Sequence, residues 1–209
     1  MSYPGRARLL LALLAVAGTV ACSQLGQTGE QAQVAQAFES WKDAVIKHQT
    51  AQAMAFIPGH VDDYLSRLNS GVTGNSIVAP GVASSLTPGV DLFLRTALEK
   101  KVPPDLRANL TVGALLKRIT DRNLFNPHTV QQITLGRVSV NGNRASAEVY
   151  YQGTLTALRL PFVKEGDAWK IDVMALLPYA EVLMRVDRAV KGETEAQQVD
   201  QLVSKLPSL

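Results

Sequence analysis

The fold is decided by residues 133–173, which read ITLGRVSVNGNRASAEVYYQGTLTALRLPFVKEGDAWKIDV. Apolar and polar residues alternate over most of this stretch, which is the period of a strand with one buried face. Asn141-Gly142 predicts a two-residue hairpin of type I′, a turn that needs positive φ at both central positions. Glu165-Gly166-Asp167 marks a further tight turn. The stretch therefore predicts a four-stranded antiparallel meander with one buried and one wetter face.

The same alternation predicts which side chains face the core. It loses step near Gly136, where one residue is skipped, and such a break in parity is typical of a β-bulge. Lys170 and Asp172 alternate with the apolar residues of the last strand and are predicted to face solvent. The predicted inward-facing residues of the second, third and fourth strands are Ala145, Ala147, Val149, Tyr151, Leu158, Leu160, Phe162, Trp169, Ile171 and Val173.

Helical periodicity lies on both sides of these strands. Residues 31–48 carry apolar side chains at steps of three and four and predict an amphipathic N-terminal helix. Residues 87–126 predict a helical middle. Two C-terminal helices follow, one starting at Pro178 and one opened by a capping box of Thr194 and Gln197. The order predicts an α+β fold, in which the N-terminal helix and the helical middle pack on the four-stranded meander.

One segment of the predicted domain lacks any sustained period. Residues 69–90 contain no charged residue and are rich in Gly, Ser, Thr and Pro, which is the composition of a long loop. Loops of this length inside a compact domain are uncommon and serve as lids or as disordered insertions. We therefore expect a single α+β domain over residues 31–209 with a flexible loop at 69–90.

The N-terminus predicts a targeting segment. Arg6 and Arg8 precede an uncharged stretch over residues 9–21. As a helix this stretch spans about 20 Å, short of the roughly 30 Å hydrocarbon core of a membrane. A basic start, a short apolar stretch and small residues at its end are typical of a secretory signal peptide, here residues 1–21.

The only cysteine of the chain, Cys22, stands where a signal peptide would be cut. Thr19-Val20-Ala21-Cys22 resembles the lipobox of bacterial lipoproteins, with Thr19 where Leu is usual. The resemblance implies that Cys22 becomes the first mature residue and carries three acyl chains, and that Ser23 directs the protein to the outer membrane. Residues 22–30 would then hold the lipidated Cys22 and a flexible tether. The alternative is ordinary cleavage after Ala15-Val16-Ala17.

A second resemblance concerns the soluble domain. Residues 31–48 and 133–174 together resemble bacterial lipoproteins with the nuclear transport factor 2-like (ketosteroid-isomerase-like) cone fold, through the strand Trp169-Lys170-Ile171 after an acidic turn. The resemblance implies a curved antiparallel sheet that wraps around the N-terminal helix and can leave a pocket. It implies little about chemistry, because the family includes binding modules, isomerases and dehydratases.

Composition and motifs exclude several classes of function. A single cysteine excludes a Cys-based zinc cluster, and the net charge of +3 falls by two when Arg6 and Arg8 are removed. A nucleic acid partner is therefore not expected. The sequence contains no phosphate-binding loop, nucleophile elbow or H-E-x-x-H pair. His48, His60 and His128 lie far apart without metal-ligand spacing, so we predict no metal and no cofactor.

The candidate site residues are few. Four side chains on the predicted apolar faces are candidates to line a pocket, and they are Trp41, His48, Tyr151 and Trp169. No catalytic residue is assigned. His60 with Asp62 and Asp63 forms the densest ionisable cluster, but two acids at a helix start are explained by the helix dipole.

These observations predict a non-enzymatic, membrane-anchored lipoprotein of the bacterial cell envelope, on the outer membrane and facing the periplasm. It would bind a protein partner or a small apolar ligand. Two alternatives remain open. One is a pocket enzyme of the isomerase or dehydratase type, which requires at least two convergent titratable side chains in a cavity. The other is a structural or assembly accessory that docks through its C-terminal helices, which requires an exposed apolar patch there.

Overall fold

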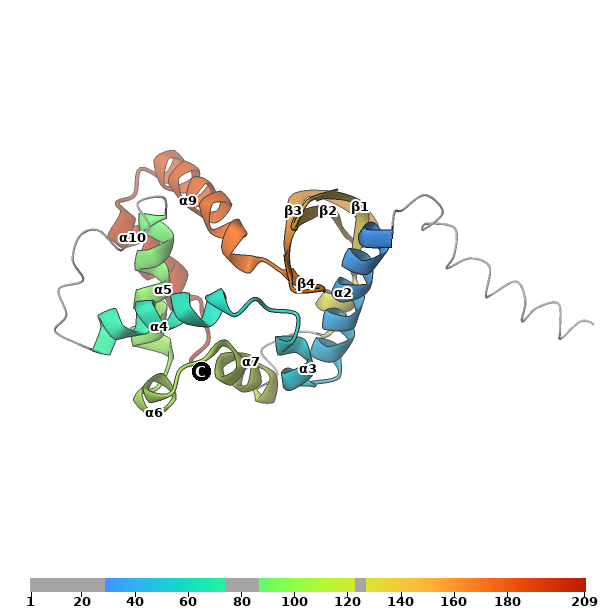
Figure 1. Cartoon of the computed structure of the whole chain (residues 1–209). Helices are drawn as coiled ribbons and strands as arrows, with labels where there is room; N and C mark the ends of the chain where they lie inside the picture. Colours follow the sequence, from blue (N-terminus) through green and yellow to red (C-terminus); the bar gives the residue numbers. More distant parts are fainter. Residues whose placement is uncertain (1–28, 74–86, 123–126) are drawn as a thin grey trace, which may run out of the picture.

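The computed structural model describes residues 29–73, 87–122 and 127–209, except for the side chains of residues 71–73. Within those residues the chain forms nine α-helices, one 3-10 helix and one four-stranded sheet, which confirms the α+β class. Figure 1 shows two lobes side by side, a sheet lobe with α2 and a helical lobe built around α5. The predicted signal peptide and Cys22 lie outside the described residues.

The sheet is the predicted antiparallel meander. Its strands are β1 (Ile133–Asn141), β2 (Arg144–Tyr151), β3 (Thr154–Glu165) and β4 (Ala168–Ile171), in the order β1-β2-β3-β4. The register of β1 against β2 shifts between Leu135 and Val138, so the bulge predicted near Gly136 is confirmed. Trp169 and Ile171 are buried as predicted, while Tyr151 at the end of β2 is exposed. A strand end is no longer covered by the opposite layer, and this explains the exposure of Tyr151.

The turn geometry differs from the prediction. Asn141 pairs with Arg144, so the central turn residues are Gly142 and Asn143, and of the two only Gly142 has positive φ, at 59°. Positive φ at the first central position alone is the pattern of type II′, so the predicted type I′ turn is wrong here. The type I′ pattern occurs one hairpin later, where Gln152 and Gly153 have φ of 52° and 76°.

Helix α2 (Gly29–Ile46) covers the buried face of the sheet. Its side chains Val34, Ala37 and Phe38 pack against Phe162 and Trp169 in the largest core cluster. The short helices α3 (Thr50–Met54) and α8 (Pro127–Gln131) close a smaller cluster at the other end of α2. The predicted tether is two residues too long, because Gly29 and Glu30 already belong to α2, and Glu30 forms an ion pair with Lys164 of β3 at 2.9 Å.

The helical lobe combines segments from both sides of the sheet in the sequence. Before the sheet come α4 (His60–Thr73), α5 (Pro88–Lys101), α6 (Pro104–Ala108) and α7 (Val112–Asp121). After it come the 3-10 helix η1 (Val173–Leu176), α9 (Leu177–Lys191) and α10 (Glu195–Ser204). Helix α5 lies in the centre and packs against α4, α9 and α10. The capping box of Thr194 and Gln197 at the start of α10 is confirmed.

Two further expectations are corrected. The loop predicted at 69–90 is wrong at both ends, because α4 continues to Thr73 and α5 begins at Pro88; residues 74–86 lie outside the described residues. Asp172 is buried rather than solvent-facing. Its carboxylate accepts a hydrogen bond from the backbone N–H of Ala175 at 3.3 Å and so caps η1, which is a tertiary role that strand alternation does not reveal.

Candidate ligand-binding cavity

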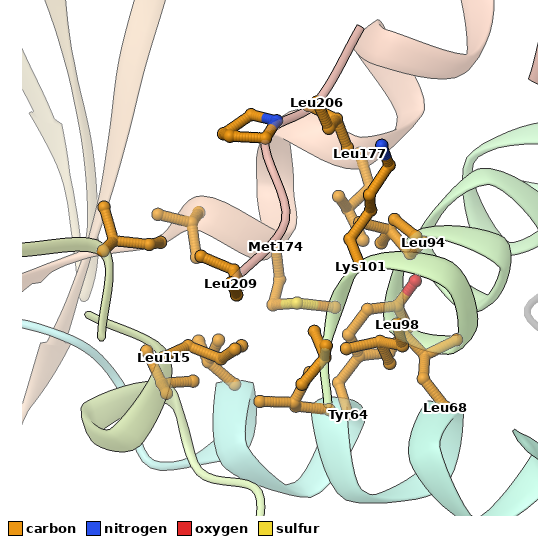
Figure 2. Close-up of a pocket in the computed structure, with 18 residues that line it drawn as sticks. Tyr64, Leu68, Leu94, Leu98, Lys101, Leu115, Met174, Leu177, Leu206 and Leu209 are labelled. Atoms are coloured by element: carbon orange, nitrogen blue, oxygen red, sulfur yellow. The ribbon is translucent and has the colours of Figure 1, made fainter. Parts of the chain in front are cut away.

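The helical lobe contains a cavity of about 480 Å³. It lies between α4, α5, α7, η1 and the start of α9, and the chain after α10 completes its wall (Figure 2). The lining is almost wholly aliphatic, and Met174 extends its thioether toward the centre of the group of side chains. The residues that line the cavity are Val61, Tyr64, Leu65, Leu68, Leu94, Ala97, Leu98, Lys101, Val102, Val112, Leu115, Ile119, Val173, Met174, Leu177, Leu206, Pro207 and Leu209.

The wall formed by residues 206–209 is held by two backbone contacts. The N–H of Leu209 donates to the carbonyl of Lys101 at the end of α5, at 2.8 Å. The guanidinium of Arg122, at the end of α7, donates to the carbonyl of Ser208 at 3.2 Å. Because α5 and α7 lie on different sides of the cavity, these residues form a strap across it that turns Leu206 and Leu209 inward.

Tyr64 of α4 presents its ring to the cavity but not a free hydroxyl. The hydroxyl donates a hydrogen bond to the buried carboxylate of Asp91 on α5, which also accepts from Thr87 at 3.4 Å. Burial raises the pKa of Tyr64 well above its usual range, and the hydrogen bond to Asp91 raises this pKa further. The hydroxyl is thus a structural donor at neutral pH, and the cavity meets only the apolar part of Tyr64.

A buried carboxylate fixes α9 against the start of α5. Glu181 of α9 is 2% exposed and accepts a hydrogen bond from the backbone N–H of Val90 at 2.9 Å. Arg185 donates to its other oxygen, also at 2.9 Å. Burial alone would raise the pKa of Glu181, but the hydrogen bonds from Val90 and Arg185 outweigh it and lower this pKa. Gly89 leaves room for the carboxylate, since a Cβ there would lie 3.1 Å from its oxygen.

Helix α9 turns an apolar face to solvent. Its exposed large apolar side chains recur at steps of three and four, the spacing of one helix face, and are between 44% and 81% exposed. They are Tyr179, Val182, Leu183, Val186 and Val190. The face that packs on the helical lobe carries Glu181 instead, together with Met184, whose carbonyl accepts a hydrogen bond from Gln198 of α10 at 2.8 Å. The inward face of this helix is therefore mixed, with a buried carboxylate beside apolar side chains such as Leu177, while its most apolar face points to solvent.

A group of ionisable side chains lies at the junction between the two lobes. His60, at the start of α4, lies with Nε2 3.4 Å from Asp172 and Nδ1 3.8 Å from Glu165. Glu165 also pairs with Lys170 at 2.8 Å, and this hydrogen bond lowers the pKa of Glu165. His60 does not line the cavity, although its neighbour Val61 does. The group links the lobes and does not face the cavity.

None of the four candidate pocket residues lines the cavity. Trp41 packs on Phe38 within the α2 core, with ring centroids 5.9 Å apart, and Trp169 is buried in the same cluster. His48 is exposed just after α2, at a positive φ of 59°. Tyr151 is 38% exposed at the end of β2.

The sequence carried one signal that could have pointed to the real cavity. The helical middle and α4 are rich in leucine at helical spacing, yet they contain few aromatic side chains to fill the space between four helices. Leucine stripes alone do not distinguish a filled core from a hollow one. The scarcity of aromatic residues therefore indicates a cavity only once the arrangement of the helices is known.

No family model, no curated protein and no solved structure matches this chain. The resemblance to the nuclear transport factor 2-like fold therefore stays a prediction. Among the described helices, none is both long and apolar enough to cross a membrane. Residues 29–73, 87–122 and 127–209 also contain no cluster of three or more His, Cys, Asp or Glu side chains that could hold a metal ion.

Proposed function

We propose that this protein is a lipid-anchored binding module of the bacterial cell envelope that takes up a small apolar ligand in the cavity of its helical lobe. The observation that carries the proposal is the apolar lining of a space of about 480 Å³. Small-molecule sites commonly measure roughly 300–1,000 Å³ and have mostly apolar walls with a few polar groups. Protein interiors are otherwise close-packed, so a space of this size is costly unless a ligand fills it.

The lining favours binding over catalysis. Tyr64 and Lys101 are the two titratable side chains among the lining residues. The hydroxyl of Tyr64 is committed to Asp91 and carries a raised pKa, so it is poorly suited to move a proton near neutral pH. A pocket enzyme would need a second group that converges on the same point as Lys101, and no other lining residue in the described part of the chain supplies one.

The anchor rests on Cys22 and its lipobox-like context. Seven residues, 22–28, separate the proposed lipid from α2, and this segment reaches at most about 25 Å. The domain would therefore stay within one domain diameter of the bilayer. We expect the intact mass of membrane-purified protein to show a chain that begins at Cys22 and carries three acyl chains. A mature chain that begins at Gly18 would contradict the anchor.

A neutral fluorescent probe tests ligand binding. N-phenyl-1-naphthylamine should bind the purified domain with a rise in fluorescence, because its rings fit an apolar cavity. Leu115→Trp places an indole in the cavity and should abolish the rise. Leu155→Trp on β3 is the matched control, since Leu155 is exposed outside the cavity, and it should bind the probe like the parent protein. Equal binding by both variants would contradict the proposal.

A second candidate function is supported by the exposed face of α9. A contiguous apolar face at helical spacing marks a protein-interaction surface, which is what an accessory that docks through its C-terminal helices requires. Val186→Glu would place a charge at the centre of this face without touching the cavity. If α9 docks on an envelope protein, affinity capture from native membranes should recover a partner with the parent protein and lose it with Val186→Glu. Probe binding should be unchanged in that variant.

A further inference from the structure

Among the described residues that line the cavity, Lys101 is the only one with a charged side chain. It is the last residue of α5, and its half-buried side chain runs along the cavity wall beside Leu94 and Leu98. Figure 2 shows its nitrogen at the edge of the apolar side chains, on the side of Leu206. A lysine commonly lays its aliphatic stem along apolar surface and keeps its ammonium at the margin. This arrangement gives the cavity an apolar interior and one cationic point at its rim.

The ammonium of Lys101 has no acidic partner within the described residues. The ion pairs there include that of the adjacent Lys100, which binds Asp200 of α10 at 2.8 Å, but none that involves Lys101. The segments outside the described residues contain no Asp or Glu at all. Both lysines stand at the C-terminal end of α5, where a cation is favoured by the helix dipole. Only Lys101 also borders the cavity, so its charge is available to whatever enters there.

The cavity volume sets the size of the apolar part of a ligand. About 480 Å³ corresponds to roughly sixteen water volumes of about 30 Å³ each, and a methylene group occupies nearly the volume of a water molecule. One unbranched alkyl chain of medium length fits such a space. The two long chains of a membrane phospholipid do not.

We propose that the ligand is a single-chain amphiphile with an anionic head group, whose alkyl chain fills the cavity while its head pairs with the ammonium of Lys101. This inference rests on the proposed function, because it requires the cavity to bind a ligand at all. A carboxylate and a phosphate share the chemistry that Lys101 would recognise, since its ammonium acts as a point charge toward either.

The test compares ligands that differ only in the head group. Dodecanoate, dodecyl phosphate and dodecyltrimethylammonium, each below its micelle concentration, and 1-dodecanol, below its solubility limit, are titrated against the protein loaded with N-phenyl-1-naphthylamine. Both anions should displace the probe about tenfold more tightly than the alcohol, because a charge-assisted contact at a half-buried position is worth about one decade in affinity. The stronger of the two anions identifies the head group. The cation should bind more weakly than the alcohol.

Three variants assign the preference to a residue. Lys101→Met keeps the apolar stem and should remove the tenfold preference for the anions while leaving affinity for 1-dodecanol within about twofold. Lys101→Glu should reverse the preference toward dodecyltrimethylammonium. Lys100→Met is the matched control at the same helix end, and it should keep the anion preference.

The outcomes separate the two proposals. An alcohol that binds as tightly as the anions, or an anion preference that survives in Lys101→Met, overturns the inference and leaves apolar-ligand binding intact. If neither the probe nor any dodecyl compound binds, the proposed function fails and the inference fails with it. A fluorescence and circular dichroism comparison confirms that each variant is folded, and binding of 1-dodecanol provides the same check within the titration.

Discussion

The two lobes of this protein differ in how completely side chains fill their interiors. The sheet lobe is filled by large aromatic side chains, and Phe38, Phe162 and Trp169 are each at most 3% exposed. The helical lobe is built mainly from leucine and valine and leaves a space of about 480 Å³ between its helices. Interiors gain stability from close packing, whereas a binding site must keep its space open. The chain therefore separates the part that supplies stability from the part that we propose to bind.

The largest loss of stability should come from removing a large side chain from the core of the sheet lobe. Trp169→Ala should lower the free energy of unfolding by about 3–5 kcal/mol, because the indole is buried in the main core cluster. Chemical denaturation measures the loss. Leu155→Ala is the control, and it should change stability by less than about 0.5 kcal/mol because Leu155 is 53% exposed. A loss below about 1 kcal/mol for Trp169→Ala would contradict the buried register of β4.

A smaller but still clear effect should follow from loosening the helical lobe. Glu181→Gln removes a charged acceptor from the Val90 N–H and from Arg185, and should cost roughly 1.5–3 kcal/mol. Glu195, whose side chain is 37% exposed in its ion pair with Arg188, supplies a control in Glu195→Gln, which should cost less than about 1 kcal/mol. Equal losses in the two variants would show that the buried carboxylate has no special role.

The same carboxylate predicts a pH dependence. The pKa of Glu181 is lowered in the folded protein, so its contribution to stability is fully present above the ordinary glutamate pKa of about 4.3. It is lost as the pH falls through the folded pKa. Acid should therefore destabilise the parent protein more steeply than Glu181→Gln. Unfolding curves at neutral and acidic pH measure the difference, and parallel pH profiles would contradict the assignment.

Substitutions that enlarge a side chain should affect the stability of the two lobes differently. Ala147 is fully buried between β1 and β3, and Ala147→Leu should cost roughly 1–3 kcal/mol by overpacking. Leu115→Phe adds volume beside the cavity and should cost less than about 1 kcal/mol, since the ring enters open space. Denaturation of both variants measures the contrast. If both lost the same stability, the cavity would be filled in solution by rearrangement of its own walls.

The smallest effect is expected at the junction of the lobes. His60→Gln should change the free energy of unfolding by less than about 1 kcal/mol, because the imidazole is 46% exposed and lies 3.4 Å from Asp172 and 3.8 Å from Glu165. Denaturation at pH 7 measures it. A loss above about 2 kcal/mol would mean that this contact holds the lobes together.

The sheet could be predicted from the sequence because its signals are local. Strand alternation, the skipped residue near Gly136 and the turn at Gly166 each depend on a few adjacent residues. The errors in the same region have tertiary causes. Asp172 is buried because it caps η1 and lies beside His60, and neither contact can be seen in the alternation of β4. Tyr151 is exposed because β2 ends there.

The cavity could not be predicted for a different reason. Its walls come from five separate segments of the chain, and each leucine in them has the spacing of an ordinary core residue. The spacing of apolar residues predicts which face of each helix is buried. It does not predict whether side chains fill the space between the buried faces of several helices. From the sequence, docking through the C-terminal helices remained only one alternative. The sequence does not show that Glu181 faces inward and that the apolar side chains of α9 face solvent.

The contact between Glu181 and Val90 also has a consequence for how the chain reaches its native state. The two residues are 91 positions apart, and the meander lies between them in the sequence. Antiparallel strands joined by short turns make mostly local contacts and form early, whereas distant contacts wait for loop closure. Each doubling of a loop costs about 0.6 kcal/mol in closure entropy, so a meander that is already folded shortens the loop that α9 must close. We therefore expect stopped-flow refolding followed by far-ultraviolet circular dichroism to show formation of the meander in a fast phase. The docking of α9 on α5 should follow in a slower phase.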